Sequence, residues 1–207
     1  MHFLTDFADQ AVILPIVLAV AAVLAAQGWR RGAVAWLAAI AGTFATMLAL
    51  KLAFLACTPV FGPADMRSPS GHVAAATVVA GGLAALLLRG RASVLPIATL
   101  AGAVIGVSRV ALGMHSVPEV ALGALVGLVG AAALAWLAGP PPPRLRMARL
   151  VGAVALVAVL FHGLHLPAEA AIRHTALNAA RFLTACQSAP GAILTRDLPD
   201  PAVRSDR

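Results

Sequence analysis

Long apolar runs alternate with short polar segments along most of the chain. Several of these runs approach the ~17–25 residues that an α-helix needs to cross a bilayer. The pattern predicts an all-α protein, a polytopic transmembrane helical bundle of about six spans, of which the last is near the short limit. The runs cover residues 11–26, 33–57, 72–88, 93–112, 118–137 and 150–166.

The pattern changes after residue 166, and this change divides the chain. We expect one integral membrane domain over residues 1–166. Residues 167–187 place arginines among alanines, which is typical of a helix lying on the membrane surface. Residues 188–207 are rich in Pro, Asp and Arg and are predicted to be a disordered tail.

Composition supports the membrane interpretation. Of the 207 residues 61% are hydrophobic and only 11% are charged, which is far more apolar surface than a soluble domain of this size needs. The net charge of +7 would suit a nucleic-acid binder, but the basic residues are scattered between apolar runs. They are better explained as topology signals and contacts to anionic membrane lipids, so no nucleic-acid partner is expected.

Basic residues concentrate in three loops, at residues 28–32, 89–91 and 144–149. The positive-inside rule places these loops in the cytoplasm and the loops at 58–72 and 113–117 outside, together with both termini. The Ala- and Arg-rich composition is compatible with the inner membrane of a bacterium, with the polar loops facing the periplasm or exterior.

Two cysteines, Cys57 and Cys186, form no metal-binding spacing. Both fall on the predicted outer side, where a disulfide could persist. Two unpaired cysteines acting as small hydrophobic residues are the alternative.

A polar segment at residues 67–72, Arg-Ser-Pro-Ser-Gly-His, separates two apolar runs. Pro69 disfavours helix just before it, and Ser70 is a good N-cap for the run that follows. Gly71 lets a ligand approach the backbone. The free amides at such a helix start, with the positive end of the helix dipole, form an anion site that suits phosphate. An ordinary capped helix entry is the alternative.

Further ionisable and polar residues fall on the same predicted membrane face. Any one of them has a plain explanation: Lys51 and Arg109 could extend to the interface, and His72 could be a satisfied helix-end histidine. Their convergence on one face favours a functional site, because polar groups within spans are costly. The set comprises Lys51, Arg67, Ser70, His72, Ser108, Arg109, His115 and Glu119.

His115 and Glu119 are four residues apart and would share one helix face. A carboxylate on one imidazole nitrogen fixes the tautomer and leaves the other nitrogen as a base or nucleophile. Ser116, Pro118 and Glu119 also form a capping box that opens a helix. Both interpretations stay open, and the two roles are compatible.

Three motifs now give a family resemblance. Ser108-Arg109, five residues, His115, three residues and Glu119 resembles the third signature of the type 2 phosphatidic acid phosphatase superfamily. Pro69-Ser70-Gly71-His72 matches the second signature, and Lys51, six residues, then Thr58-Pro59 resembles the first. The motifs occur in the family's order over about residues 33–137, which would be the helical phosphatase core.

The resemblance implies a metal-independent phosphatase without cofactors. His115 would be the nucleophile that forms a phosphohistidine, Glu119 would orient it, and His72 would be the acid and then the base. The phosphate would be held by the residues that bring positive charge or donors to the site: Lys51, Ser70, Gly71, Arg109 and Ser108. Phosphoryl transfer needs such charge around its equatorial oxygens and in-line attack.

Two positions depart from the family pattern. Thr58 stands where the first signature has Arg, and Glu119 stands where the third usually has Asp. Losing a bidentate cation could weaken transition-state binding by several kcal/mol. Arg67, just before the second signature, is a candidate replacement.

The expected substrate is a lipid phosphate or pyrophosphate, because a protein almost wholly within lipid has no domain to capture a soluble substrate. Polyprenyl pyrophosphate, phosphatidate-like and lipid A-like phosphates all remain candidates. A phosphotransferase with the same site and a catalytically impaired lipid-binding protein are alternatives. A transporter is disfavoured, because the polar residues lie at one face and do not line a path through the spans.

Overall fold

The computed structural model describes residues 6–56, 66, 68–88, 91–164, 172, 174 and 175. Within these residues the chain forms six α-helices and no strand, which confirms the all-α prediction. A 3₁₀ turn, η1, covers Arg91–Ser93. The helices are α2 (Gln10–Ala26), α3 (Arg30–Ala56), α5 (Gly71–Leu87), α6 (Val94–Ala111), α7 (Val117–Ala138) and α8 (Met147–Phe161).

Among the described helices, α3, α6 and α7 are long and apolar enough to cross a membrane, judged by length and composition. The other three are apolar but shorter, with 17 residues in α2, 17 in α5 and 15 in α8. The count of about six spans therefore stays a prediction.

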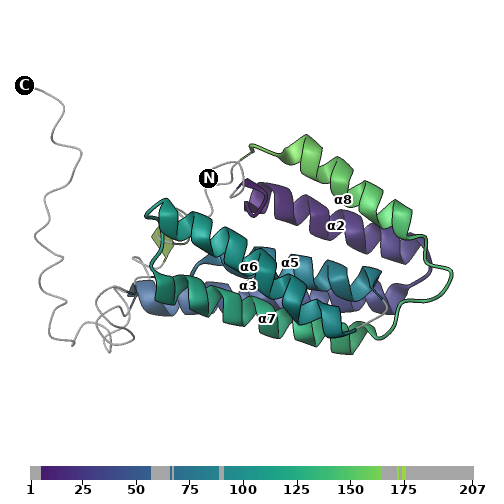
Figure 1. Cartoon of the computed structure of the whole chain (residues 1–207), viewed down its shortest axis with the longest axis horizontal. Coiled ribbons are helices and arrows are strands. Elements are labelled where there is room, and N and C mark those ends of the chain that lie inside the picture. Colours follow the sequence, from purple (N-terminus) through teal and green to yellow (C-terminus); the bar gives the residue numbers. More distant parts are fainter. Residues whose placement is uncertain are drawn as a thin grey trace, which may run out of the picture.

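Helix α5 lies at the centre of the bundle and packs against α3, α6 and α7 (Figure 1). Helices α2 and α8 lie side by side along one flank, where α2 also packs on α3. The fully buried Trp36 of α3 joins these two layers, because its indole Nε1 donates to the Val17 carbonyl of α2 at 3.0 Å. The arrangement brings together the C-terminal ends of α3 and α6 and the N-terminal ends of α5 and α7.

Small residues let α6 and α7 approach α5 closely. A Cβ added to Gly123 of α7 would collide with the carbonyl oxygen of Ser70, and one added to Gly127 would lie 2.6 Å from Thr77 Cβ. Gly102 of α6 likewise faces the Thr77 hydroxyl. These contacts follow the small-xxx-small pattern in the sequence. They press the start of α5 against α7, which brings residues 68–72 to the third motif.

One predicted boundary was wrong. The segment 28–32 was expected to be a basic loop, but α3 already begins at Arg30. The chain turns at Gly28, whose φ of +83° suits glycine. The Trp29 carbonyl then accepts from Ala33 N at 3.1 Å, so the new helix starts immediately after the turn. Both arginines therefore belong to the first turn of α3.

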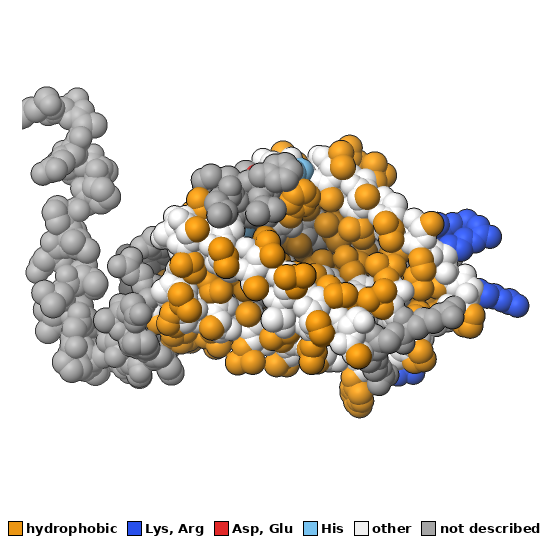
Figure 2. Space-filling view, viewed as in Figure 1, with side chains coloured by type: hydrophobic (Ala, Val, Ile, Leu, Met, Phe, Trp, Pro, Cys, Tyr) orange, Lys and Arg blue, Asp and Glu red, His pale blue; other side chains and the backbone are white. Residues whose placement is uncertain are grey.

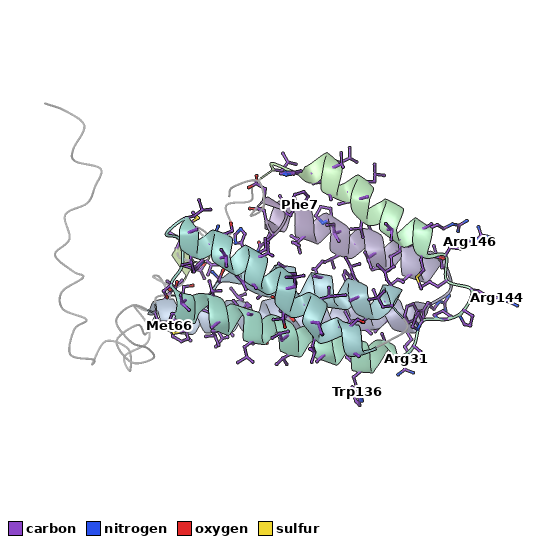
Figure 3. All side chains as sticks on the ribbon, viewed as in Figure 1. Phe7, Arg31, Met66, Trp136, Arg144 and Arg146 are labelled. Atoms are coloured by element: carbon purple, nitrogen blue, oxygen red, sulfur yellow. The ribbon has the colours of Figure 1, made fainter. Side chains whose placement is uncertain are left out.

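The visible flank of the bundle is mostly apolar, and basic side chains gather at one end (Figure 2). Arg31, Arg144 and Arg146 lie at that end, whereas Met66 lies at the opposite one (Figure 3). Arg31 is structural as well as charged, because its Nε donates to the Leu137 carbonyl near the end of α7 at 2.8 Å. We call these two ends the arginine end and the motif end.

Several predictions concern residues outside the described part of the chain. One is that Arg67 supplies the positive charge that the family pattern has at position 58. The others are the pairing of Cys57 with Cys186, most of the helix at 167–187 and the tail at 188–207.

Candidate active site

The turn between α6 and α7 presents His115. Helix α6 ends in a Schellman motif, in which Met114 N donates to the Arg109 carbonyl at 3.0 Å and Gly113 N to the Val110 carbonyl at 2.9 Å. Gly113 supplies the positive φ of +66° that this motif needs. The chain then enters α7 at Val117. His115 therefore lies in the short connection between the end of α6 and the start of α7.

Glu119 holds the His115 ring, because His115 Nδ1 lies 2.8 Å from Glu119 Oε2. Both side chains are nearly buried, with relative exposures of 8% and 6%. The same oxygen accepts from Ser116 N at 3.0 Å, which is the carboxylate half of the predicted capping box. Capping and histidine contact therefore coexist. Because the carboxylate accepts from Nδ1, the lone pair of the neutral ring is assigned to Nε2.

Glu119 also joins the second motif to the third. Its other oxygen, Oε1, accepts from Ser68 N at 2.7 Å. Its backbone carbonyl accepts from Ser70 N at 3.0 Å. One residue thus fixes the histidine, the start of α7 and the loop before α5.

Two cations are buried at the motif end. Lys51 of α3 is 3% exposed and Arg109, in the last turn of α6, is 9% exposed. The Lys51 ammonium lies 3.9 Å from where a Cβ on Gly71 would stand, so it sits beside the first residue of α5. An ammonium and a helix N-terminus are both positive, so the two together favour an anion at this position.

Burial lowers the pKa of His115 below its ordinary value of 6.5. The hydrogen bond and charge of Glu119 act in the opposite direction and raise this pKa, whereas the charges of Arg109 and Lys51 lower it further. The net effect favours the neutral imidazole at pH 7, the form that can act as a nucleophile. These contributions also show that both cations lie near the His115 ring.

The remaining predicted residues lie on the same elements. Ser70 is the N-cap residue of α5, yet its side chain makes no capping hydrogen bond. Its hydroxyl oxygen is fully buried and has no hydrogen-bond partner within the described residues. Ser108 is 1% exposed and precedes Arg109 on α6. His72 is the second residue of α5, and its side chain is 24% exposed.

The structure adds a residue that sequence reasoning did not select. Asp9, the N-cap of α2, is 7% exposed, and its Oδ2 lies 3.9 Å from His72 Nε2. The sequence offered only a weak signal, an acidic residue just before the first apolar run. Within the described part of the chain, no three His, Cys, Asp or Glu side chains are grouped as a metal site requires.

A comparison with models of known protein families identifies the family of this chain. The family model described as the PAP2 superfamily matches residues 32–140, just over half of the chain. The match covers α3, α5, α6 and α7 and therefore every described residue of the three motifs. No curated protein matches the chain. No solved structure matches it.

Proposed function

The chain belongs to the PAP2 superfamily, and we propose that it is a membrane-embedded phosphatase that hydrolyses a lipid phosphate or pyrophosphate through a phosphohistidine. Family membership supports a phosphatase-type function in general. The observation that carries the finer proposal is His115, a buried imidazole fixed at Nδ1 by Glu119 and faced by two buried cations. This arrangement is what a nucleophile for an anionic phosphorus centre needs.

In the first step, Nε2 of neutral His115 attacks phosphorus. A P–N bond forms as the P–O bond to the leaving group breaks, and the leaving oxygen takes a proton from His72. In the second step, water attacks the phosphohistidine and gives a proton to His72, while the P–N electron pair returns to His115. Phosphate is released and both histidines regain their starting states.

The phosphoryl oxygens would lie at the start of α5. Lys51 and Arg109 supply charge there, and the amides after Ser70 point along the helix axis toward the ligand. The buried Ser70 hydroxyl, without a partner in the described part of the chain, supports a ligand at this position. Ser108 adjoins Arg109 and lines the same end of α6. Because these groups are fixed before substrate binds, they stabilise developing charge with little reorganisation.

The substrate class follows from the surroundings of the site. The motif end is part of a bundle whose flank exposes many large apolar side chains. An amphiphilic phosphate can place its acyl or prenyl chains along such a flank in the bilayer while its headgroup reaches the site. The cluster of arginines at the opposite end supports a cytoplasmic arginine end and a motif end at the outer membrane face.

The test uses purified protein in detergent, with EDTA and no added metal. Polyprenyl pyrophosphate, phosphatidate and a lipid A-type phosphate are offered to wild type and to His115→Ala, and released phosphate is measured. We expect turnover of at least one lipid by wild type and a loss of at least about 10⁴-fold in the variant. Quenching with alkaline SDS, in which the acid-labile P–N bond survives, should retain ³²P from labelled substrate on wild-type protein only.

Three outcomes would contradict parts of the proposal. Equal activity in His115→Ala would exclude this histidine as the nucleophile. Transfer of label to an added acceptor lipid, rather than to water, would identify a phosphotransferase with the same site. Binding of the lipid phosphates without any release would identify a lipid-binding member that has lost turnover.

A further inference from the structure

Asp9 is brought to the candidate active site by a helix outside the family match. It precedes α2, and the match begins only at residue 32. Ala8, 2% exposed, packs with Val73 of α5 and Ile105 of α6 in a small apolar cluster. This cluster anchors the chain before α2 against the start of α5, so Asp9 is held beside the histidine of the second motif.

The two oxygens of Asp9 have different contacts. Oδ1 accepts from Ala11 N at 2.8 Å and caps α2. Oδ2 faces His72 Nε2 at 3.9 Å. Because the cap fixes the carboxylate, its second oxygen is presented to the imidazole in a defined orientation. At 3.9 Å the contact is electrostatic rather than a hydrogen bond, so it does not itself occupy a donor of the ring.

The charges at this end explain why such a carboxylate is useful. Lys51 on α3 lies beside Gly71, the residue before His72, and its positive charge opposes a positive charge on that histidine. The carboxylate of Glu119 is already bonded to His115 and to Ser68 N. Asp9 therefore supplies a negative charge to the second histidine, which must be protonated before the leaving group departs.

We propose that Asp9 is a positioning residue that orients His72 and stabilises its imidazolium for protonation of the leaving oxygen. This inference rests on the proposed phosphatase function and adds a residue from outside the family match. During P–O cleavage the imidazolium gives its proton to the leaving oxygen and becomes neutral. It recovers a proton from the attacking water in the second step.

The experiment compares leaving groups, because a proton donor matters most for a leaving oxygen that is a strong base. Wild type and Asp9→Asn are assayed with p-nitrophenyl phosphate, whose phenolate needs little protonation, and with an alkyl lipid phosphate. Asn is as good an N-cap as Asp, so the substitution retains the cap and removes the charge. Asp9→Ser also retains a cap but does not reach His72, and Asp6→Asn removes an equal charge three residues earlier.

We expect Asp9→Asn and Asp9→Ser to lower kcat for the alkyl phosphate by about 10–100-fold, a part of the full effect of general acid catalysis. The same variants should change kcat for p-nitrophenyl phosphate by less than about threefold and leave KM for both substrates nearly unchanged. Asp6→Asn should behave as wild type, and the thermal unfolding midpoint reports that the variants are folded.

An equal loss on both substrates would overturn the inference, because it would indicate a purely structural cap. No loss on either substrate would also overturn it. Failure of the underlying function is distinguishable, because wild type would then release phosphate from neither substrate.

Discussion

The two ends of the helical bundle both carry positive charge, but the charged side chains are exposed at one end and buried at the other. At the arginine end Arg31, Arg144 and Arg146 are exposed. At the motif end Lys51 and Arg109 are 3% and 9% exposed. An exposed guanidinium is hydrated or contacts lipid headgroups at little cost, whereas burying a cation is expensive. Under the proposed function, the exposed charge serves membrane topology and the buried charge serves phosphate binding.

The carboxylates show the same contrast. Asp9 and Glu119, both buried, lie at the motif end and contact the two histidines. The described loop at the arginine end is held instead by hydrogen bonds to uncharged groups. In one of them, Arg146 N donates to the side-chain oxygen Oε1 of Gln27 at 2.7 Å. Acidic and basic groups placed around two imidazoles are typical of a site that moves protons.

Among the variants that keep both histidines, the largest effect is expected from removing the buried ammonium. Lys51→Met should lower kcat by about 10²–10³-fold, as for the loss of one preorganised group that stabilises a transition-state anion. The thermal unfolding midpoint should not fall, because the change removes a buried charge and keeps most of the side-chain volume. Phosphate release and thermal unfolding in detergent measure the two quantities.

The matched control is Arg144→Met, which removes one charge at the arginine end. Its kcat should stay within about twofold of wild type, because an exposed charge so far from the site is screened. Similar losses in both variants would show that net charge, and not position, explains the effect.

A smaller effect on rate, with a shift in pH dependence, is expected for Glu119→Gln. The hydrogen bond and charge of Glu119 raise the pKa of His115, so their loss leaves burial and the cations, which lower it. His115 then loses its proton at lower pH, and the acidic limb of kcat/KM moves to lower pH. The rate itself should fall by about 10–100-fold, because the tautomer is no longer fixed.

The wild-type protein sets the reference for this shift. Its acidic limb should lie below pH 6.5, since burial lowers the pKa of His115. A limb that stays in place in Glu119→Gln would mean that another group controls the profile.

The smallest effect is expected from packing at the motif end. Gly123→Ala places a methyl group against the Ser70 carbonyl, and overpacking of this kind costs about 1–3 kcal/mol. Activity should fall as well, because the loop before α5 is pushed away from Glu119. Gly42→Ala on α3 is the control, since nothing lies within 4 Å of its added Cβ and alanine favours helix by about 0.5–1 kcal/mol. Changes of the same sign in both variants would contradict this account.

Much of the fold could be predicted because apolar length and helix signals are local. Helix positions depend on signals that act within a few residues. These signals include the 3.6-residue helix period, the glycine at position 113 and the prolines beside helix starts. The start of α3 was misplaced because polar Arg30 and Arg31 were assigned to a loop. Their helical conformation follows from the turn at Gly28 and from the Arg31 contact with Leu137, 106 residues away.

The candidate site was predicted for a different reason. His115 and Glu119 are neighbours on one helix turn, so spacing alone brings them together. The contacts of Glu119 with Ser68 N and of Asp9 with His72 join residues far apart in sequence. Such contacts depend on which helices pack together, and no local pattern encodes that choice. Family membership was correctly inferred because the motifs are short and ordered, whereas Asp9 belongs to no motif.

The bonds from Ser68 and Ser70 to Glu119 also bear on synthesis of the protein. The ribosome makes the loop before α5 first, then two further helices, and only then the residue that holds this loop. A nascent chain that ends after α6 would already contain Lys51, His72 and Arg109 but could not fix their loop. The candidate site is therefore expected to become able to catalyse a reaction only when α7 has entered the membrane. A partly inserted chain would then be unable to act on lipids.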